Sequence, residues 1–149
     1  MEPAIRANGG FINQYFGDGI KALFPGDSGA AGACRAAQAM TRLIAEEGEA
    51  IAGAGEEHRI GIGIHSGSIM LDTIGGQERL DTGVVGDVVN TASRIESLTK
   101  ELKRPILLSE TTRELIRGEN LPVEEVQRVV PRGKKAAVTL SAMSRFGVA

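Results

Sequence analysis

The segment RIGIGIHSG, residues 59–67, constrains the fold of this chain more than any other segment. Its isoleucines Ile60, Ile62 and Ile64 alternate with glycines, which is the period of a β-strand whose side chains point alternately to its two faces. One face therefore carries large apolar side chains and the other is nearly bare. Because glycine in a strand permits a close approach by other backbone, we expect a helix or another backbone segment to pack directly on the bare face.

The N-terminal part of the chain predicts a β-hairpin. Two apolar runs, FINQYF at residues 11–16 and IKALF at residues 20–24, are separated by the three residues Gly17, Asp18 and Gly19. Such a turn between two strand-like runs is typical of an antiparallel pair. Asp18 then lies at the tip, where an exposed carboxylate could bind a Mg²⁺ ion that carries phosphates. Aspartate is also a common turn residue, so the segment alone leaves both interpretations open.

The remaining segments predict an alternation of helices and strands. Residues 30–52 are Ala-rich with apolar residues at helical spacing, and a second helix is expected from Gly86 to about Leu102. Ser109 has the position of an N-cap residue for a short helix. Further strands are expected at residues 68–74, 82–85, 105–108, 126–130 and 137–143, and residues 1–5 resemble the end of a helix. This alternation favours an α/β or α+β fold.

Length and composition predict one domain without nucleic-acid or membrane signals. A chain of 149 residues corresponds to about one domain, residues 1–149. With 17 Lys and Arg against 19 Asp and Glu, the net charge of −2 gives no electrostatic basis for nucleic-acid binding. No apolar run reaches the roughly 18 residues of a membrane helix, and the first residues lack a signal-peptide pattern. Together with the single cysteine, Cys34, these features predict a soluble, cytoplasmic domain.

Two further groups of residues could carry chemistry. Asn90 and Arg94 are four positions apart in the second predicted helix, so their side chains share one helix face. An amide beside a guanidinium suits a phosphoryl group that gains charge in a transition state, although an exposed polar stripe has the same pattern. The basic segment RGKK at residues 132–135 could hold a triphosphate or form a solvated turn.

Taken together, the segments GGFINQYFGDGIKALFP, RIGIGIHSG and TGVVGDVVNTASRIESL resemble the catalytic domain of class III adenylate and guanylate cyclases. The resemblance extends from about residue 3 to residue 143. It implies an α+β, ferredoxin-like nucleotide cyclase fold with an antiparallel-rich sheet and flanking helices. It also implies that the domain works as a homodimer with sites shared across the interface. The implied reaction, part of cyclic-nucleotide signalling, converts ATP, or less readily GTP, into a 3′,5′-cyclic monophosphate and pyrophosphate with Mg²⁺ or Mn²⁺ in a two-metal site.

The resemblance also implies roles for individual residues. Asp18 corresponds to the second of two metal-binding aspartates. Asn90 corresponds to the asparagine that orients the ribose, and Arg94 to the arginine that stabilises the pentavalent phosphate. Arg132 stands where the family usually has a triphosphate-binding lysine. Because the site is shared, Asp18 of one chain is expected to face Asn90 and Arg94 of the other.

The positions that contact the base in this family depart from its usual pattern. Cyclases that use ATP often have a lysine four residues before the hairpin aspartate, where this chain has Gln14. They have an aspartate or threonine seven residues before the asparagine, where this chain has Gly83. A glutamine can donate or accept hydrogen bonds and a glycine has no side chain, so the sequence leaves ATP and GTP both open.

The largest departure concerns the start of the domain. The family's first metal-binding aspartate lies in a strand of the type Phe-x-Asp-Ile-x-Gly-Phe, well before the hairpin, whereas 17 residues precede Asp18 here. We therefore expect a domain without the family's first strand and the helices that follow it, whose sheet closes in another way or leaves an edge open. Two hypotheses follow: an active cyclase, or a truncated, catalytically impaired domain that dimerises or binds nucleotide.

Overall fold

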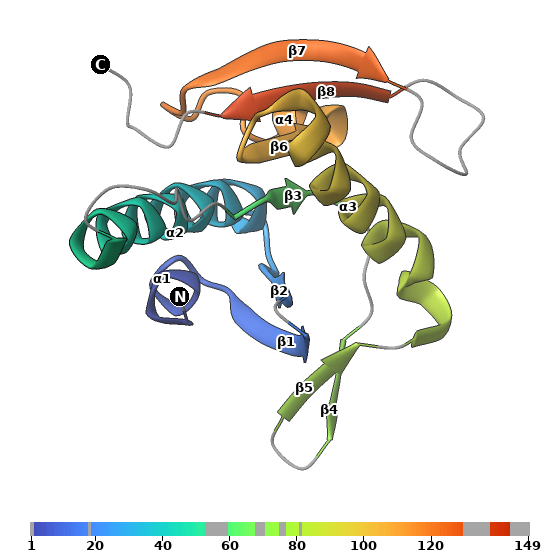
Figure 1. Ribbon diagram of the computed structural model, residues 1–149. Helices are drawn as coiled ribbons and strands as arrows, with labels where there is room; N and C mark the ends of the chain where they lie inside the picture. Colours follow the sequence, from blue (N-terminus) through green and yellow to red (C-terminus); the bar gives the residue numbers. More distant parts are fainter. Residues whose placement is uncertain are drawn as a thin grey trace.

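The computed structural model describes residues 2–17, 19–52, 60–67, 71–74, 77–80, 82–129 and 138–143. Helices and strands are mixed along the chain, giving an α+β fold (Figure 1). The helices are α1 (Glu2–Ala7), α2 (Gly29–Ala52), α3 (Thr82–Leu102) and α4 (Glu110–Leu115). The strands are β1 (Phe11–Phe16), β2 (Gly19–Leu23), β3 (Ile62–Ile64), β4 (Leu71–Ile74), β5 (Gln77–Leu80), β6 (Ile106–Ser109), β7 (Val123–Val129) and β8 (Val138–Met143). Across these ranges, no helix is both long and apolar enough to span a bilayer.

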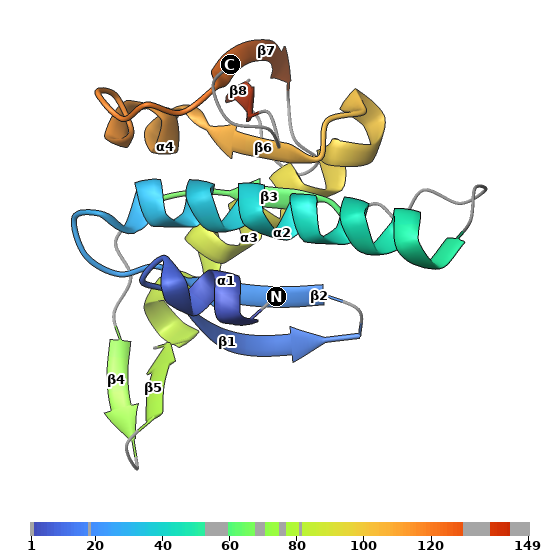
Figure 2. The same ribbon diagram turned by 90° about the vertical axis from the view of Figure 1, so that its left-hand side faces the viewer.

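The described strands form three separate sheets. The antiparallel pair β1–β2 confirms the predicted hairpin, and β4 and β5 form a second antiparallel pair. The largest sheet has the order β3-β6-β8-β7, with β3 parallel to β6 and β8 antiparallel to both of its neighbours. Figures 1 and 2 show this sheet on one side of α2 and the β1–β2 hairpin on the other.

The four-stranded sheet is covered by helices on both faces. On one face, α2 and α4 pack against a buried cluster that includes Cys34, Ile64, Ile106, Leu108, Ile116 and Met143. On the other face, α3 packs through Ile95 against Leu107, Leu140 and Ala142. Successive residues of β6 thus point to opposite helix layers, as the period of a strand requires. All four side chains of β6 are buried for this reason.

The glycines of the segment 59–67 lie against α3, which confirms that a helix packs on the bare face of this strand. A Cβ atom at Gly63 would collide with the backbone of Ala92 and Glu96 in α3, and one at Gly61 would collide with the side chain of Thr99. The two glycines therefore let the helix backbone approach β3 more closely than a larger residue would allow.

The start of α3 differs from the sequence prediction. Residues 82–85 were expected as a strand, but they form the first turn of α3, which begins at Thr82 and not at Gly86. The β-branched Val84 and Val85 favour strands, yet their cost in a helix is only a few tenths of a kcal/mol, which is too small to exclude a helix. The predicted cap at Ser109 is confirmed, because its hydroxyl accepts a hydrogen bond from the backbone N–H of Thr112.

Candidate functional site

Asn90 and Arg94 lie on the part of α3 that is turned away from the sheet. The helix is anchored by the fully buried Ile95. At about 100° per residue, Asn90 is rotated by about 140° from Ile95, and Arg94 by about 100°. The Asn90 side chain is accordingly exposed and that of Arg94 half-buried. The structure therefore confirms that the two residues share one side of a helix, and that this side is outside the core.

Gly83 belongs to the same side of α3. Because α3 is continuous from Thr82 to Leu102, Gly83 precedes Asn90 by seven helical residues. That spacing corresponds to almost two full turns, or about 10 Å along the axis, while Arg94 follows Asn90 by about 6 Å. The three positions implied by the resemblance thus form one line along the helix, although Gly83 was expected in a strand.

Gln14 lies on a different element, the hairpin strand β1. Its side chain is exposed, and its Cα atom is directly opposite that of Lys21 on β2. The register shifts between Ile12 and Gln14, so the bulge sets which residue faces Lys21. Residues directly opposite each other in an antiparallel pair have neighbouring side chains, so the half-buried Lys21 adds a cation beside Gln14. Sequence patterns did not single out Lys21, because its neighbour is set by the bulge.

Asp18 and Arg132 lie outside the described residues, so the structure does not test their predicted roles. Gly17, which precedes Asp18, has φ of 54°, a left-handed conformation that favours glycine in a turn. In the ranges that the structure describes, no group of three His, Cys, Asp or Glu side chains could hold a metal ion. The described residues therefore do not by themselves fit a divalent metal site.

Cys34 is not a candidate nucleophile. Its side chain is completely buried in the core cluster beneath α2. Burial raises the pKa of its thiol to about 12, and the nearby Arg35 offsets only part of this effect. Because the thiolate is the reactive form, a thiol with this pKa is inert at neutral pH.

Comparison with known sequences identifies the same family as the motifs. Residues 24–143 match the adenylate and guanylate cyclase catalytic domain. An adenylate cyclase of Anabaena cylindrica is 37% identical over 147 residues, which cover 94% of this chain and 29% of that protein. The terminal-differentiation specific adenylate cyclase of Dictyostelium discoideum is 32% identical over 142 residues, covering 93% of this chain and 7% of that protein. The chain thus spans less than a third of the length of these curated relatives.

Solved structures share the fold over nearly the whole chain. The adenylyl cyclase CyaB from P. aeruginosa matches with a TM-score of 0.73 at 20% identity, covering 99% of this chain and 79% of that one. A crystal structure of a guanylyl cyclase matches with a TM-score of 0.68 at 31% identity, covering 99% of this chain and 75% of that one. On the matched residues, the motifs and the shared α+β fold, the chain belongs to the family of adenylate and guanylate cyclase catalytic domains.

Proposed function

We propose that this chain is a nucleotide cyclase domain that converts ATP, and less readily GTP, into the 3′,5′-cyclic monophosphate and pyrophosphate. The observation that carries the proposal is the position of Asn90 and Arg94, one turn apart on the outward side of α3, in a chain of the cyclase family. In this reaction the ribose 3′-oxygen forms a bond to the α-phosphorus. The bond from that phosphorus to the pyrophosphate oxygen breaks, and the hydroxyl proton leaves to solvent.

Asn90 and Arg94 have side chains suited to two parts of this reaction. The amide of Asn90 can donate to and accept from the ribose, which holds the 3′-oxygen in line with the α-phosphorus. The guanidinium of Arg94 can bind two phosphate oxygens as charge builds on them in the pentavalent transition state. Since Arg94 is half-buried, its charge is less screened by water than that of a fully exposed arginine.

The base is proposed to lie between the hairpin and α3, at Gln14 and Gly83. Two curated adenylate cyclases among the relatives favour adenine. Lys21 beside Gln14 has three donors and no acceptor, which suits an acceptor on either base, such as N1 of adenine or O6 of guanine. The preference for ATP is therefore modest, and the guanylyl cyclase at 31% identity keeps GTP as the second substrate to test.

The remaining parts of the proposed site lie beyond the described residues. Asp18 is proposed to bind Mg²⁺ or Mn²⁺, and Arg132 to bind the outer phosphates. The metal would supply positive charge that neutralises the triphosphate. We propose a homodimer in which Asp18 of one chain faces Asn90 and Arg94 of its partner. The exposure of Asn90 on a helix face that does not pack on the sheet supports this arrangement.

The second candidate function is a domain that dimerises or binds nucleotide without turnover. One observation favours it: the hairpin carrying Gln14 and the sheet supporting α3 are not hydrogen-bonded to each other among the described strands. No hydrogen bond between described strands therefore fixes the separation of the two parts of the proposed site. A site whose parts can shift by an ångström can bind a substrate and still lose most of its rate.

The test is a turnover assay on the purified chain with Mn²⁺ and either ATP or GTP, with cyclic nucleotide quantified by chromatography. We expect Arg94→Ala to lower turnover by at least a hundredfold, the loss typical of removing one transition-state donor. Lys100→Ala is the matched control, since Lys100 is an exposed cation on the same helix. If neither nucleotide is cyclised but a non-cyclisable analogue binds, the second candidate function holds. If the analogue does not bind either, both proposals fail.

A further inference from the structure

A chain of hydrogen bonds joins the end of β3 to the start of α4. The Nδ1 atom of His65 is 2.8 Å from the hydroxyl oxygen of Ser109, which is in turn 3.2 Å from the hydroxyl oxygen of Thr112. The hydroxyl oxygen of Ser66 is 2.8 Å from that of Thr112. Because a hydroxyl both donates and accepts, all three bonds form with either neutral tautomer of the imidazole. The two residues that follow β3 are thus tied to the first turn of α4 and its cap.

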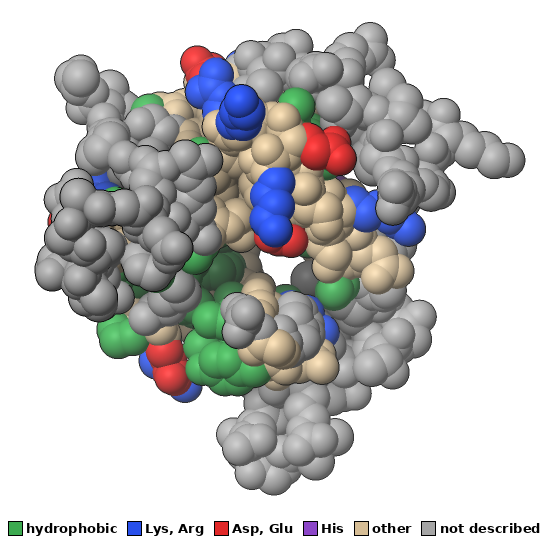
Figure 3. All heavy atoms as spheres, viewed as in Figure 1, with side chains coloured by type: hydrophobic (Ala, Val, Ile, Leu, Met, Phe, Trp, Pro, Cys, Tyr) green, Lys and Arg blue, Asp and Glu red, His purple; other side chains and the backbone are tan. Residues whose placement is uncertain are grey.

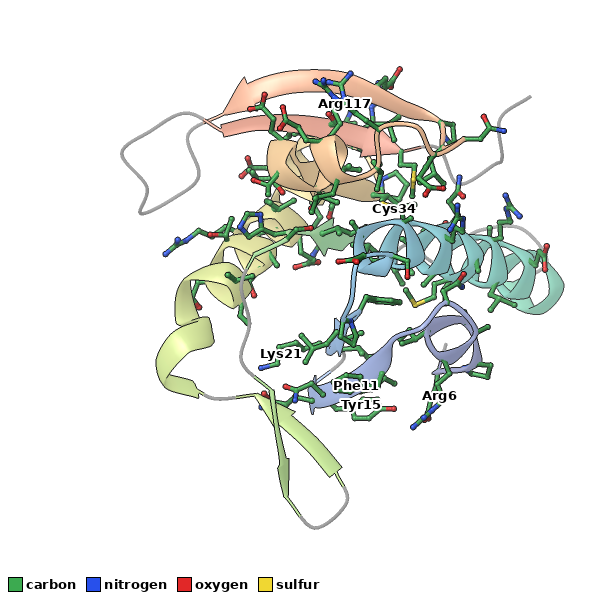
Figure 4. The ribbon with its side chains drawn as sticks, turned by 180° about the vertical axis from the view of Figure 1, so that it is seen from behind. Arg6, Phe11, Tyr15, Lys21, Cys34 and Arg117 are labelled. Atoms are coloured by element: carbon green, nitrogen blue, oxygen red, sulfur yellow. The ribbon has the colours of Figure 1, made fainter. Side chains whose placement is uncertain are left out.

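The pairing of β3 with β6 brings these residues together. Ile64 and Leu108 are partners in the parallel register, so His65 and Ser109 are the next residues beyond them. Figures 1 and 4 show the end of β3 beside α3 and close to α4. Ser109 is 2% exposed, and no described histidine is visible on the face shown in Figure 3. The hydrogen bond is therefore shielded from water, where it is stronger than at a surface.

The segment that carries His65 lies along α3. A Cβ atom at Gly63 would be 2.5 Å from the carbonyl oxygen of Ala92, and one at Gly67 would be 2.7 Å from the side chain of Val88. Val88 and Ala92 are four residues apart, so they lie on one side of the helix. Residues 63–67 therefore support this part of α3, and His65 is at their centre.

Asn90 lies on the side of α3 opposite this support. It is two residues from both Val88 and Ala92, which is a rotation of about 200° around the helix axis. A turn of helix moves as a unit, so a shift of the support moves Asn90 by a similar amount. In a reaction that needs an exact alignment, a displacement of about 1 Å can lower the rate about a hundredfold. The hydrogen bonds at the end of β3 can therefore affect the reaction without any contact with the nucleotide.

We propose that His65 is a positioning residue for the cyclase reaction: its hydrogen bond to Ser109 holds residues 63–67 against α3 and so fixes the position of Asn90. This inference rests on the proposed function of the chain. If packing alone held the segment, an apolar side chain of similar size at position 65 would serve equally well. The proposal therefore requires the hydrogen bond itself and not only the volume of the imidazole.

Two variants of His65 separate the hydrogen bond from the volume. Asparagine and leucine branch at the same carbon, but only asparagine places a hydrogen-bonding atom near the position of Nδ1. With Mn²⁺ and whichever of ATP and GTP is cyclised faster, His65→Leu should lower kcat at least about tenfold and change KM less than about threefold. His65→Asn should retain at least about a third of kcat. Ile116→Val is the control for lost stability, because Ile116 is buried in the core cluster on the other face of the sheet, and it should leave kcat unchanged.

Amide hydrogen exchange measures the support of α3 without any nucleotide. In His65→Leu, the backbone amides around Ala92 should exchange at least about tenfold faster, while those around Leu98 should change less than about threefold. His65→Asn should change neither region. Ser109→Gly removes the same hydrogen bond from the other side, and it serves if His65→Leu does not fold, because glycine is tolerated as an N-cap residue.

Several results would overturn the inference. These are an equal kcat in the leucine and asparagine variants, an equal loss in Ile116→Val, and unchanged exchange around Ala92 in His65→Leu. The proposed function fails on a different result, the absence of cyclic nucleotide from the unsubstituted chain. In that case, exchange along α3 still shows whether His65 holds the helix, so the two failures are distinguishable.

Discussion

Substituting alanine at Gly63 tests how tightly α3, the helix that carries Asn90 and Arg94, is held on β3. A Cβ atom at Gly63 would be 2.5 Å from the carbonyl oxygen of Ala92 and 2.9 Å from the Cα of Glu96. These atoms are helix backbone and cannot rotate away, so the helix itself must move. Gly61 on the same strand face is the matched control, because an added Cβ there meets mainly the side chains of Thr99 and Glu96.

The two substitutions have different expected costs. Overpacking usually costs about 1–3 kcal/mol. The collision with helix backbone at Gly63 is expected at the upper end, about 3 kcal/mol. The collision at Gly61 is expected to cost about 2 kcal/mol, because the buried Thr99 hydroxyl that it meets must break its hydrogen bond to the Glu96 carbonyl to move. Both alanines recover about 0.7 kcal/mol because they restrict the unfolded chain. The net loss is thus about 2 kcal/mol for Gly63→Ala and about 1 kcal/mol for Gly61→Ala. For a chain of this length, the difference corresponds to a Tm that is about 2–4 °C lower for Gly63→Ala.

Urea unfolding followed by circular dichroism measures both free energies of unfolding. The structure predicts that both variants unfold at a lower urea concentration with an unchanged slope, and that the loss for Gly61→Ala is about half of the loss for Gly63→Ala. Equal stability of the two variants would refute the close backbone contact between β3 and α3.

Three further predictions concern buried polar groups. Burial raises the pKa of the Cys34 thiol to about 12 in the folded chain, so above about pH 9 the thiol ionises in the unfolded chain but not in the folded one. Above that pH, the free energy of unfolding of the unsubstituted chain should therefore fall by roughly 1 kcal/mol per pH unit more than that of Cys34→Ala, as measured by urea titration. Parallel pH profiles of the two chains would contradict this. Ser109→Ala removes the cap of α4 and the hydroxyl contacts with His65 and Thr112, so it should cost about 1–2 kcal/mol in the same assay. A loss below about 0.5 kcal/mol would contradict the capping role. The hydroxyl of Ser141 is buried without a hydrogen-bond partner among the described residues. Ser141→Ala should therefore raise the free energy of unfolding by about 1 kcal/mol. A decrease of that size would show that the hydroxyl has a hydrogen-bond partner outside those residues.

Local patterns in the sequence predicted the elements whose stability depends on near neighbours. The Ala-rich segment predicted a helix within one residue of α2. The glycine-isoleucine alternation predicted a strand with a helix or another backbone segment on its bare face, and the structure shows the helix. The spacing of Asn90 and Arg94 placed them on one helix face, since the helical period alone decides this. The prediction of a strand at residues 82–85 was wrong: these residues form the first turn of α3, and β-propensity is too weak and context-dependent to decide so short a segment.

Long-range pairing could not be read from the sequence. The parallel pairing of β3 with β6 joins residues more than forty positions apart, and no local signal specifies such a partner. The position of Lys21 beside Gln14 follows from a bulge, which moves the register by one residue without a strong sequence signature. The roles predicted for Asp18 and Arg132 remain predictions, because both residues lie outside the ranges that the structure describes.

The two sides of the proposed nucleotide site belong to different parts of the fold. Asn90 and Arg94 are fixed to the four-stranded sheet, because α3 is anchored there by Ile95 and by its contact with Gly63. Gln14 lies on the hairpin, and no hydrogen bond between described strands joins the hairpin to that sheet. A change in the separation of the two sides should therefore lower turnover more than it lowers nucleotide binding, because catalysis depends on that separation more closely than binding does.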